Sequence, residues 1–359
     1  MHKNGHAIFM SLCLHLWKLS IYISTNMEHI GIKEHGQRKR IPLFDLAKYV
    51  AITLVVIGHS YHLTIGYSSK LLPIIYSFHM PLFMMISGFF SVNSYSRPFI
   101  PLVKRKAIQL LLPVISCTVL SCLLLYIWGE KGFFRDEIVG GIWFLKVLFM
   151  CYIIVFLTLK ICGRKIILGG LLSCCLLFVI PGGGTLKLNL MLLFFWTGYF
   201  LNRYFDYINP NLGKISLGAG FIFVVLCFFG YATFEEKITL EYIITFPIDF
   251  TACYLVGLTG SLFTLGLCKL YMKHFSGKKT KLLLRTGQYT LGIYIVQIIL
   301  VERILDHYCD LNMDFLSNNI IDFIATPLIG IILTFVCYYI VQIFKRNKYI
   351  NLLLLGNGT

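Results

Sequence analysis

Uninterrupted apolar runs of membrane-spanning length recur along most of this chain and leave it few ways to fold. A helix of roughly 20 apolar residues crosses the hydrocarbon core of a bilayer, and 57% of these residues are hydrophobic while only 13% are charged. Membrane β-barrels instead show short segments of alternating hydrophobicity. The sequence therefore predicts an all-α, polytopic membrane helical bundle with about ten transmembrane helices, near residues 43–64, 73–93, 107–128, 139–159, 165–181, 187–203, 214–233, 248–272, 286–304 and 319–344.

The distribution of basic residues predicts which helix ends face the cytoplasm. Lysine and arginine are enriched in the short cytoplasmic loops of membrane proteins. With the first helix starting inside, 21 of them fall in cytoplasmic stretches, against Lys70, Lys131, Arg135, Lys187 and Lys237 in the opposite loops. Both termini are therefore expected in the cytoplasm. The net charge of +16 indicates this topology and an attraction to anionic membrane lipids, and no nucleic-acid partner is expected.

The predicted helices leave too little polar sequence for a separate soluble domain. Residues 41–345 are expected to form a single transmembrane domain, followed by a short cytoplasmic tail at 346–359. Residues 1–40 are expected to be a cytoplasmic or interfacial segment, because their apolar stretch is too short to span a bilayer. Under an alternative hypothesis Met27 is the true start and residues 1–26 are a start-site artefact.

Two histidines lie inside the first two predicted spans. Ionisable side chains are costly in hydrocarbon, so such residues mark candidate functional sites. His59 follows Lys48 by eleven residues, or about 16 Å along a helix, and the second span, running back, brings His79 near the level of His59 and Ser87 toward that of Lys48. We expect these polar groups to share one cavity, with an imidazole able to act as a base at one end and a cation near the cytoplasmic mouth.

The same two spans carry a family resemblance. They read Phe-Asp-Leu-Ala-Lys at 44–48, Gly-His at 58–59, Phe-His-Met-Pro-Leu-Phe at 78–83 and Ser-Gly-Phe at 87–89. Together these motifs resemble the membrane-bound acyltransferase 3 family, and most closely its bacterial sugar (fucose-type) O-acetylase branch. Weaker matches follow in the same order, with Lys-Arg-Lys at 104–106, Leu-Leu-Pro at 111–113, Trp-Phe-Leu at 143–145 and Thr-Gly-Gln-Tyr-Thr-Leu-Gly-Ile-Tyr at 286–294.

The resemblance implies an O-acetyltransferase of the bacterial cytoplasmic (inner) membrane. Such an enzyme moves an acyl group, usually acetyl from acetyl-CoA, to a hydroxyl of a surface or secreted glycan or of its lipid-linked precursor, and polysaccharide-assembly proteins are expected as partners. By position, the resemblance implies catalytic roles for His59 and His79. It also implies a donor-binding role for the basic residues Lys48, Arg97, Lys104, Arg105 and Lys106, and supporting roles for Asp45, Ser87 and Trp143.

Two positions depart from the family pattern. Gln297 stands where many members have a histidine, which weakens any catalytic role for that position. Lys146 stands where a proline is common, and the sequence assigns it no partner. Several candidates also have structural explanations: Lys48 as a snorkelling interfacial cation, Ser87 with its following glycine as a site of close helix packing, and Trp143 as part of an interfacial aromatic belt. Asp249, Glu302 and Arg303 are interpreted as solvated or paired residues near the outer helix ends, with acceptor-sugar binding as the alternative.

The residues themselves indicate the chemistry. A sugar hydroxyl is a poor nucleophile, and a positioned imidazole that accepts its proton accelerates attack by about 10²–10⁴. His59 is the candidate base, and His79 is expected to orient it or to donate toward the developing oxyanion. Direct transfer in a ternary complex is favoured, and an acyl-histidine intermediate remains open.

Other classes of protein were weighed against this hypothesis. The cysteines lie mostly in apolar runs and form no metal-binding pattern, so no metal is expected. A polytopic transporter or flippase of glycan or lipid precursors would use the histidines as a proton relay, but it predicts broken helices in paired halves, which the sequence does not show. A non-catalytic assembly partner leaves the histidine pair unexplained.

Overall fold

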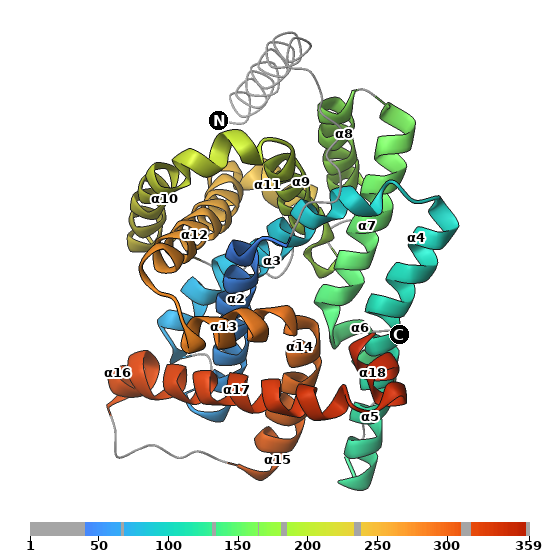
Figure 1. Ribbon diagram of the computed structural model, residues 1–359, viewed down its shortest axis with the longest axis vertical. Helices are drawn as coiled ribbons and strands as arrows, with labels where there is room; N and C mark the ends of the chain where they lie inside the picture. Colours follow the sequence, from blue (N-terminus) through green and yellow to red (C-terminus); the bar gives the residue numbers. More distant parts are fainter. Residues whose placement is uncertain are drawn as a thin grey trace.

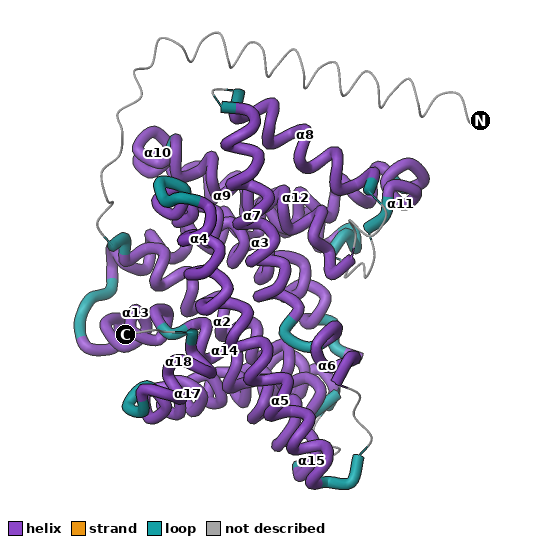
Figure 2. The backbone as a smooth tube through the Cα atoms, turned by 90° about the vertical axis from the view of Figure 1, so that its right-hand side faces the viewer, coloured by secondary structure: helices purple, strands orange, loops and turns teal. Residues whose placement is uncertain are grey.

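The computed structural model describes residues 40–65, 68–130, 134–163, 165–180, 185–232, 238–309 and 317–356 (Figures 1 and 2). Every regular element within these ranges is an α-, 3-10 or π-helix, and no strand occurs there. The predicted all-α class is therefore confirmed. The predictions for residues 1–39, an interfacial segment or an alternative start, lie outside the described residues.

A helical hairpin lies at the centre of the bundle (Figure 1). It consists of α2 (Pro42–Ser60) and α3 (Leu71–Ser91), joined by a short 3-10 turn. Pro42 at the start of α2 has the backbone angle that the first helical turn requires, and Asp45 in that turn suits the positive end of the helix dipole. Helices from the rest of the chain pack around the hairpin: α7 (Trp143–Cys162), α9 (Leu188–Arg203), α12 (Pro247–His274), α13 (Lys278–Gln288), α14 (Thr290–Ile299) and α17 (Thr326–Phe344).

The remaining helices form the outer parts of the bundle. On one side of Figure 1 lie α4 (Phe99–Lys106), α5 (Leu112–Ile127), α6 (Phe134–Gly140) and α8 (Ile166–Val179), and on the other lies α10 (Phe205–Phe228). The short helix α11 (Leu240–Thr245) packs against α12. Three π-helical segments interrupt the α-helices, a feature often found at functional sites: η4 (Ala107–Leu111), η6 (Leu300–Leu305) and η7 (Ile321–Ala325). Short helices α15 (Asp306–Tyr308) and α16 (Asn318–Ile320) flank the last two of these.

Seven helices in the described part of the chain are long and apolar enough to cross a membrane. The count is eight if Lys278–Gln288 and Thr290–Tyr308, which meet at an angle of 72°, are taken together as one broken span. The predicted span 286–304 thus bends near its start, at Tyr289. Two other predicted spans correspond to α8 and α9, of 14 and 16 residues, so the count of ten and the cytoplasmic position of both ends stay predictions.

Glycines allow the central helices to approach each other closely. A Cβ added to Gly88 of α3 would overlap the backbone carbonyl of Phe195 in α9, and one added to Gly198 of α9 would overlap the carbonyl of Met85 in α3. Small residues at helix crossings permit such backbone contact and compensate for the weak hydrophobic driving force within a membrane. Gly88 is therefore a packing residue, as one interpretation of the sequence proposed.

The predicted tail contains a helix of its own. Asn347 caps α18 (Lys348–Leu355) by accepting hydrogen bonds from the backbone N–H groups of Tyr349 and Ile350. This helix packs against α5 and α14, and Gly356 lies against the backbone of Gln109 in η4. The end of the described chain thus supports the helices that carry the candidate site.

Candidate active site

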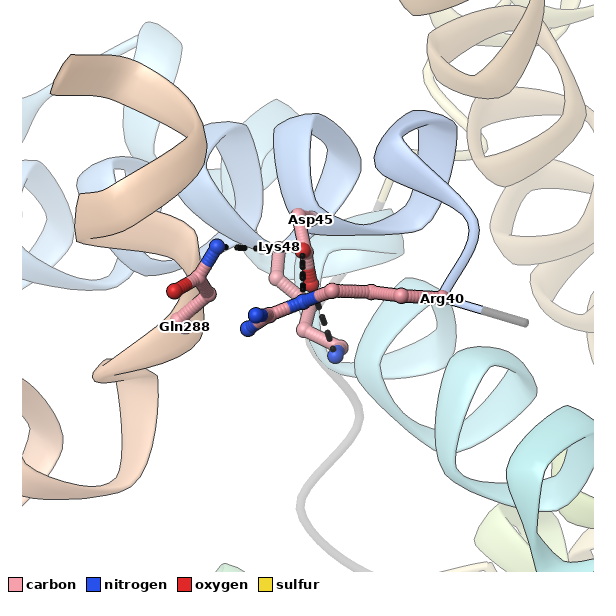
Figure 3. Close-up of polar contacts among 4 residues, drawn as sticks. All are labelled: Arg40, Asp45, Lys48 and Gln288. Carbon is pink, nitrogen blue, oxygen red and sulfur yellow. Dashed lines mark hydrogen bonds and ion pairs between the residues drawn. The ribbon is translucent and has the colours of Figure 1, made fainter. Parts of the chain in front are cut away.

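A buried carboxylate organises the basic end of α2 (Figure 3). Asp45 is 5% exposed and accepts hydrogen bonds from Arg40 Nε at 2.9 Å, Lys48 Nζ at 3.4 Å and Gln288 Nε2 at 3.3 Å. Gly287 lets the end of α13 sit directly on the Asp45 backbone carbonyl, which explains how Gln288 reaches the carboxylate. Asp45 therefore holds Lys48 in place and ties α2 to α13, and a buried acceptor with three donors is well satisfied.

A cavity of about 300 Å³ begins beside Lys48. This volume is at the lower end of the range for small-molecule sites. Its polar residues lie mainly toward the basic ends of α2, α3 and α4, and most of its wall is apolar. The lining residues are Lys48, Ile52, Val55, Met80, Phe83, Ile86, Ser87, Phe90, Ser94, Lys106, Gln109, Leu110, Phe144, Leu145, Leu148, Tyr152, Thr290, Leu291 and Tyr294.

Two lysine ammonium groups are presented to this cavity over aromatic rings. Lys106 Nζ lies 3.7 Å from the ring centroid of Tyr152 and 3.4 Å from Gln109 Oε1, and Lys48 Nζ lies 4.9 Å from the ring centroid of Phe90. Contact with an aromatic face stabilises a cation that has left bulk water. A cavity with cations at its mouth and apolar walls beyond is suited to a ligand with an anionic head and a long, weakly polar arm.

His59 is paired with a carboxylate from a distant part of the chain. Its Nδ1 lies 3.1 Å from Oε1 of Glu302 in the π-helix η6. The same oxygen accepts a hydrogen bond at 3.2 Å from the side-chain amide of the fully buried Gln297. With its Nδ1–H donated to the carboxylate, the neutral ring presents an unprotonated Nε2, the arrangement of a general base with an orienting partner.

His79 is buried and makes its own local hydrogen bond. Its Nδ1 donates to the backbone carbonyl of Ile75 at 2.7 Å, so the neutral ring carries a lone pair at Nε2. In this state His79 accepts a hydrogen bond at Nε2 and has no free N–H to direct at an oxyanion. The His79 ring lies 5.2 Å from the ring of Tyr76. Tyr294 of α14, the helix that carries Gln297, lines the 300 Å³ cavity.

Lys48 lines the 300 Å³ cavity and neither imidazole does, so the expectation that the three line one chamber stays a prediction. Along α3, several residues between Met80 and Phe90 line that cavity, while Met80, Ser77 and Tyr76 line a second one of about 30 Å³ on the far side. The sequence pattern of α3 did not indicate that the Met80 side chain lies between two cavities.

The other predicted residues divide between the cavities and the surface. Ser87 and Lys106 line the larger cavity and Trp143 lines the smaller one. Arg97, Lys104 and Arg105 are exposed at the same basic end and line neither.

Several residues at the site were not predicted as functional. Glu302 was interpreted as a residue of an outer helix end, and Gln297 was assigned a weakened role. The carboxylate within a long apolar helix was itself a usable signal. Tyr294 and Gln109 also line the cavity, but nothing in the sequence distinguished these uncharged residues from packing residues. Within the described residues no group of three histidine, cysteine, aspartate or glutamate side chains is placed to hold a metal ion.

Comparison with known proteins identifies the class to which this architecture belongs. The family described as an acyltransferase domain (Acyl_transf_3) matches residues 41–343, so the chain belongs to this family, and the resemblance seen in the sequence is confirmed. By length and composition, its apolar helices are those of a multi-pass membrane protein.

Two individual relatives are similar over part of their length. Nodulation protein NolL of Mesorhizobium japonicum is 36% identical over 135 residues, which cover 33% of this chain and 36% of the relative. Nodulation protein NolL of Sinorhizobium fredii is 35% identical over 125 residues, which cover 31% of this chain and 34% of the relative. The chain thus matches about a third of the length of these relatives. No solved structure shows significant similarity to it.

Proposed function

We propose that this membrane acyltransferase moves an acetyl group from cytosolic acetyl-CoA to a hydroxyl of a surface or exopolysaccharide sugar, or of its lipid-linked precursor, at the bacterial cytoplasmic membrane. One observation carries the proposal. Glu302, the partner of His59, is hydrogen-bonded to Gln297 of α14, and Tyr294 of the same helix lines a cavity that Lys48 and Lys106 also line.

The donor enters from the basic end. Lys48 and Lys106 attract the phosphates of CoA, with the exposed Arg97, Lys104 and Arg105 as further cations around the mouth. The apolar walls receive the pantetheine arm, so that the thioester points toward Tyr294. The positive-inside rule supports a cytoplasmic position for this end of the bundle, where acetyl-CoA is available.

The transfer step uses the imidazole as a base. Nε2 of His59 takes the proton of the sugar hydroxyl as its oxygen attacks the thioester carbonyl, forming a C–O bond and a tetrahedral oxyanion. Glu302 stabilises the imidazolium that forms and keeps the ring in the required tautomer. Collapse of the intermediate breaks the C–S bond, and the imidazolium returns its proton to the departing thiolate. The products are an acetyl ester and CoA, and the histidine is regenerated.

His79 assists the acceptor in this scheme. Its Nδ1 donates a hydrogen bond to the backbone carbonyl of Ile75. Its Nε2 therefore accepts a hydrogen bond from the acceptor sugar and helps to orient that sugar. A direct transfer of this kind needs no acyl-histidine. Trapping with labelled acetyl-CoA without acceptor distinguishes the two routes, since only the covalent route leaves label on the protein.

Release of free thiol from acetyl-CoA tests the proposal. Membranes containing the chain should release thiol only when deacetylated glycan is supplied, and His59→Ala should abolish this release at an unchanged protein level. A transporter would behave differently: His59→Ala would stop export of the polymer and leave its acetylation unaffected. Thiol release that persists in His59→Ala contradicts the proposed base.

A further inference from the structure

A second cavity lies on the side of His59 and His79 that faces away from Lys48. It has a volume of about 30 Å³ and is lined by Tyr76, Ser77, Met80, Trp143 and Lys187 among others. Trp143 and Lys187 lie at the starts of α7 and α9, and Tyr76 and Ser77 lie in the first half of α3. The starts of these three helices lie at the end of the bundle opposite Lys48.

Met80 lies between the two cavities and lines both. Its sequence neighbour His79 is therefore next to the partition. The ring of Tyr76, which lines the second cavity, lies 5.2 Å from the His79 ring, so this cavity approaches His79 from the side away from the basic end.

Backbone strain is concentrated around this cavity. Three non-glycine residues in the described chain have positive φ angles, Ile142 at 41°, Leu186 at 54° and Lys187 at 59°. One of them lines the cavity, and the other two directly precede the lining residues Trp143 and Lys187. Such conformations are rare, especially for a β-branched isoleucine, and they cluster where the surrounding structure holds a binding residue in place.

Lys146 explains how one of these strained turns is held. Its ammonium donates to the backbone carbonyls of Ile138 at 2.6 Å and Gly141 at 2.8 Å. Both carbonyls belong to the end of α6 and the turn that leads to Ile142, where helix carbonyls lack partners within the helix. The lysine that the sequence could not place thus fixes the turn that precedes Trp143.

We propose that Tyr76, Trp143 and Lys187 form the subsite for the acceptor sugar. This inference rests on the proposed function and extends it. A volume of about 30 Å³ corresponds to one water molecule of liquid, so the cavity admits the reacting hydroxyl while the sugar ring stays outside. The rings of Trp143 and Tyr76 supply apolar surface with polar tips, and Lys187 donates hydrogen bonds to oxygens of the same sugar. Lys146 is a positioning residue for Trp143.

Donor and acceptor then approach the reaction from opposite ends of the bundle. Acetyl-CoA occupies the cavity of Lys48 and Lys106, and the hydroxyl enters on the side of Lys187. Met80 is the partition that the two substrates must contact or displace to meet.

Steady-state kinetics in membranes test this assignment. The acceptor probe is deacetylated glycan extracted from cells that lack the gene, added in increasing amounts with radiolabelled acetyl-CoA. Lys187→Asn, which tolerates a positive φ better than most residues, and Trp143→Leu should each raise the half-saturating amount of glycan about tenfold or more. The KM for acetyl-CoA should stay within about twofold of the wild type.

Matched controls lie at the same end of the bundle outside both cavities. Lys70→Asn removes a lysine whose backbone N–H, not its side chain, bonds Asp322, and Trp128→Leu removes a tryptophan that contacts His307 and Tyr308. Neither should change the half-saturating amount of glycan. For Lys146, replacement by methionine should raise that amount, and replacement by arginine should restore it.

The outcomes separate this inference from the proposed function. An unchanged glycan requirement in well-expressed Lys187→Asn and Trp143→Leu, or a rise in the KM for acetyl-CoA instead, overturns the subsite. Wild-type membranes that transfer no label to glycan overturn the proposed function, and the subsite with it. If Trp143→Leu lowers the amount of folded protein, Trp143→Phe supplies the test, since it keeps an aromatic ring, smaller than the indole, and loses the N–H.

Discussion

Replacing Glu302 with glutamine separates the charge of the His59 partner from its geometry. In the structure both His59 Nδ1 and Gln297 Nε2 contact the same oxygen, Oε1, at 3.1 and 3.2 Å. The amide oxygen of Glu302→Gln has the same shape and accepts both hydrogen bonds. The variant therefore keeps the orientation of the ring and loses only the negative charge that stabilises the imidazolium.

The size of the effect follows from the difference between charged and neutral hydrogen bonds. Hydrogen bonds to charged groups contribute about 1.5–3 kcal/mol and neutral ones about 0.5–1.5 kcal/mol. A loss of about 1–2 kcal/mol in the transition state corresponds to a decrease in kcat of about 5- to 30-fold. Glu302→Ala should lose more, because it leaves the buried amide of Gln297 without its acceptor and the His59 tautomer unfixed.

The assay is acetyl transfer to glycan at saturating acetyl-CoA. The KM for acetyl-CoA should not change, because Glu302 lines neither cavity. Glu130→Gln is a matched control, since Glu130 forms a histidine pair of similar length, 3.2 Å to His307, at the exposed end of α5. Wild-type kcat in Glu302→Gln, or an equal decrease in Glu130→Gln, would refute the role assigned to the carboxylate.

Three further predictions concern donor binding and packing. Lys48→Met should raise the KM for acetyl-CoA about tenfold or more with little change in kcat, because a charge-assisted contact is lost; unchanged donor saturation kinetics would argue against the donor cavity. Gly88→Ala should lower the thermal unfolding midpoint in detergent, while Gly218→Ala, where an added Cβ meets nothing within 4 Å, should not; equal effects would contradict the close helix contact. Arg303 Nη2 lies 2.7 and 2.8 Å from the Glu137 oxygens. In a double-mutant cycle, the double variant Glu137→Gln with Arg303→Gln should therefore lose less free energy of unfolding than the two single variants lose together. Strict additivity would contradict their coupling.

The sequence was sufficient for the class of fold and for the family. Apolar runs of spanning length specify helices because no other open structure satisfies its backbone groups in lipid. The bend at Tyr289 could not be read from the apolar run that begins near it, since the break depends on how α13 packs on the backbone of Asp45.

The sequence could not predict most of the contacts between residues of the site. Glu302 and His59 lie far apart in the chain, and hydropathy places each in a helix without saying which helices touch. Among the basic residues near α4, Lys106 turns inward over Tyr152 while Lys104 and Arg105 remain exposed. Which of these side chains points inward depends on the rotation of α4 against α7. The sequence pattern of this short segment does not determine that rotation.

Acetyl content of the surface glycan tests the central claim most directly. Glycans are compared by mass spectrometry from cells with the wild-type chain, cells without the gene and cells with His59→Ala at an equal protein level. We expect units heavier by one acetyl group in the wild type alone, with the extra mass removed by mild alkali. Acetylated glycan in cells with His59→Ala, or identical glycans in all three strains, would contradict a His59-dependent transfer of acetyl to sugar.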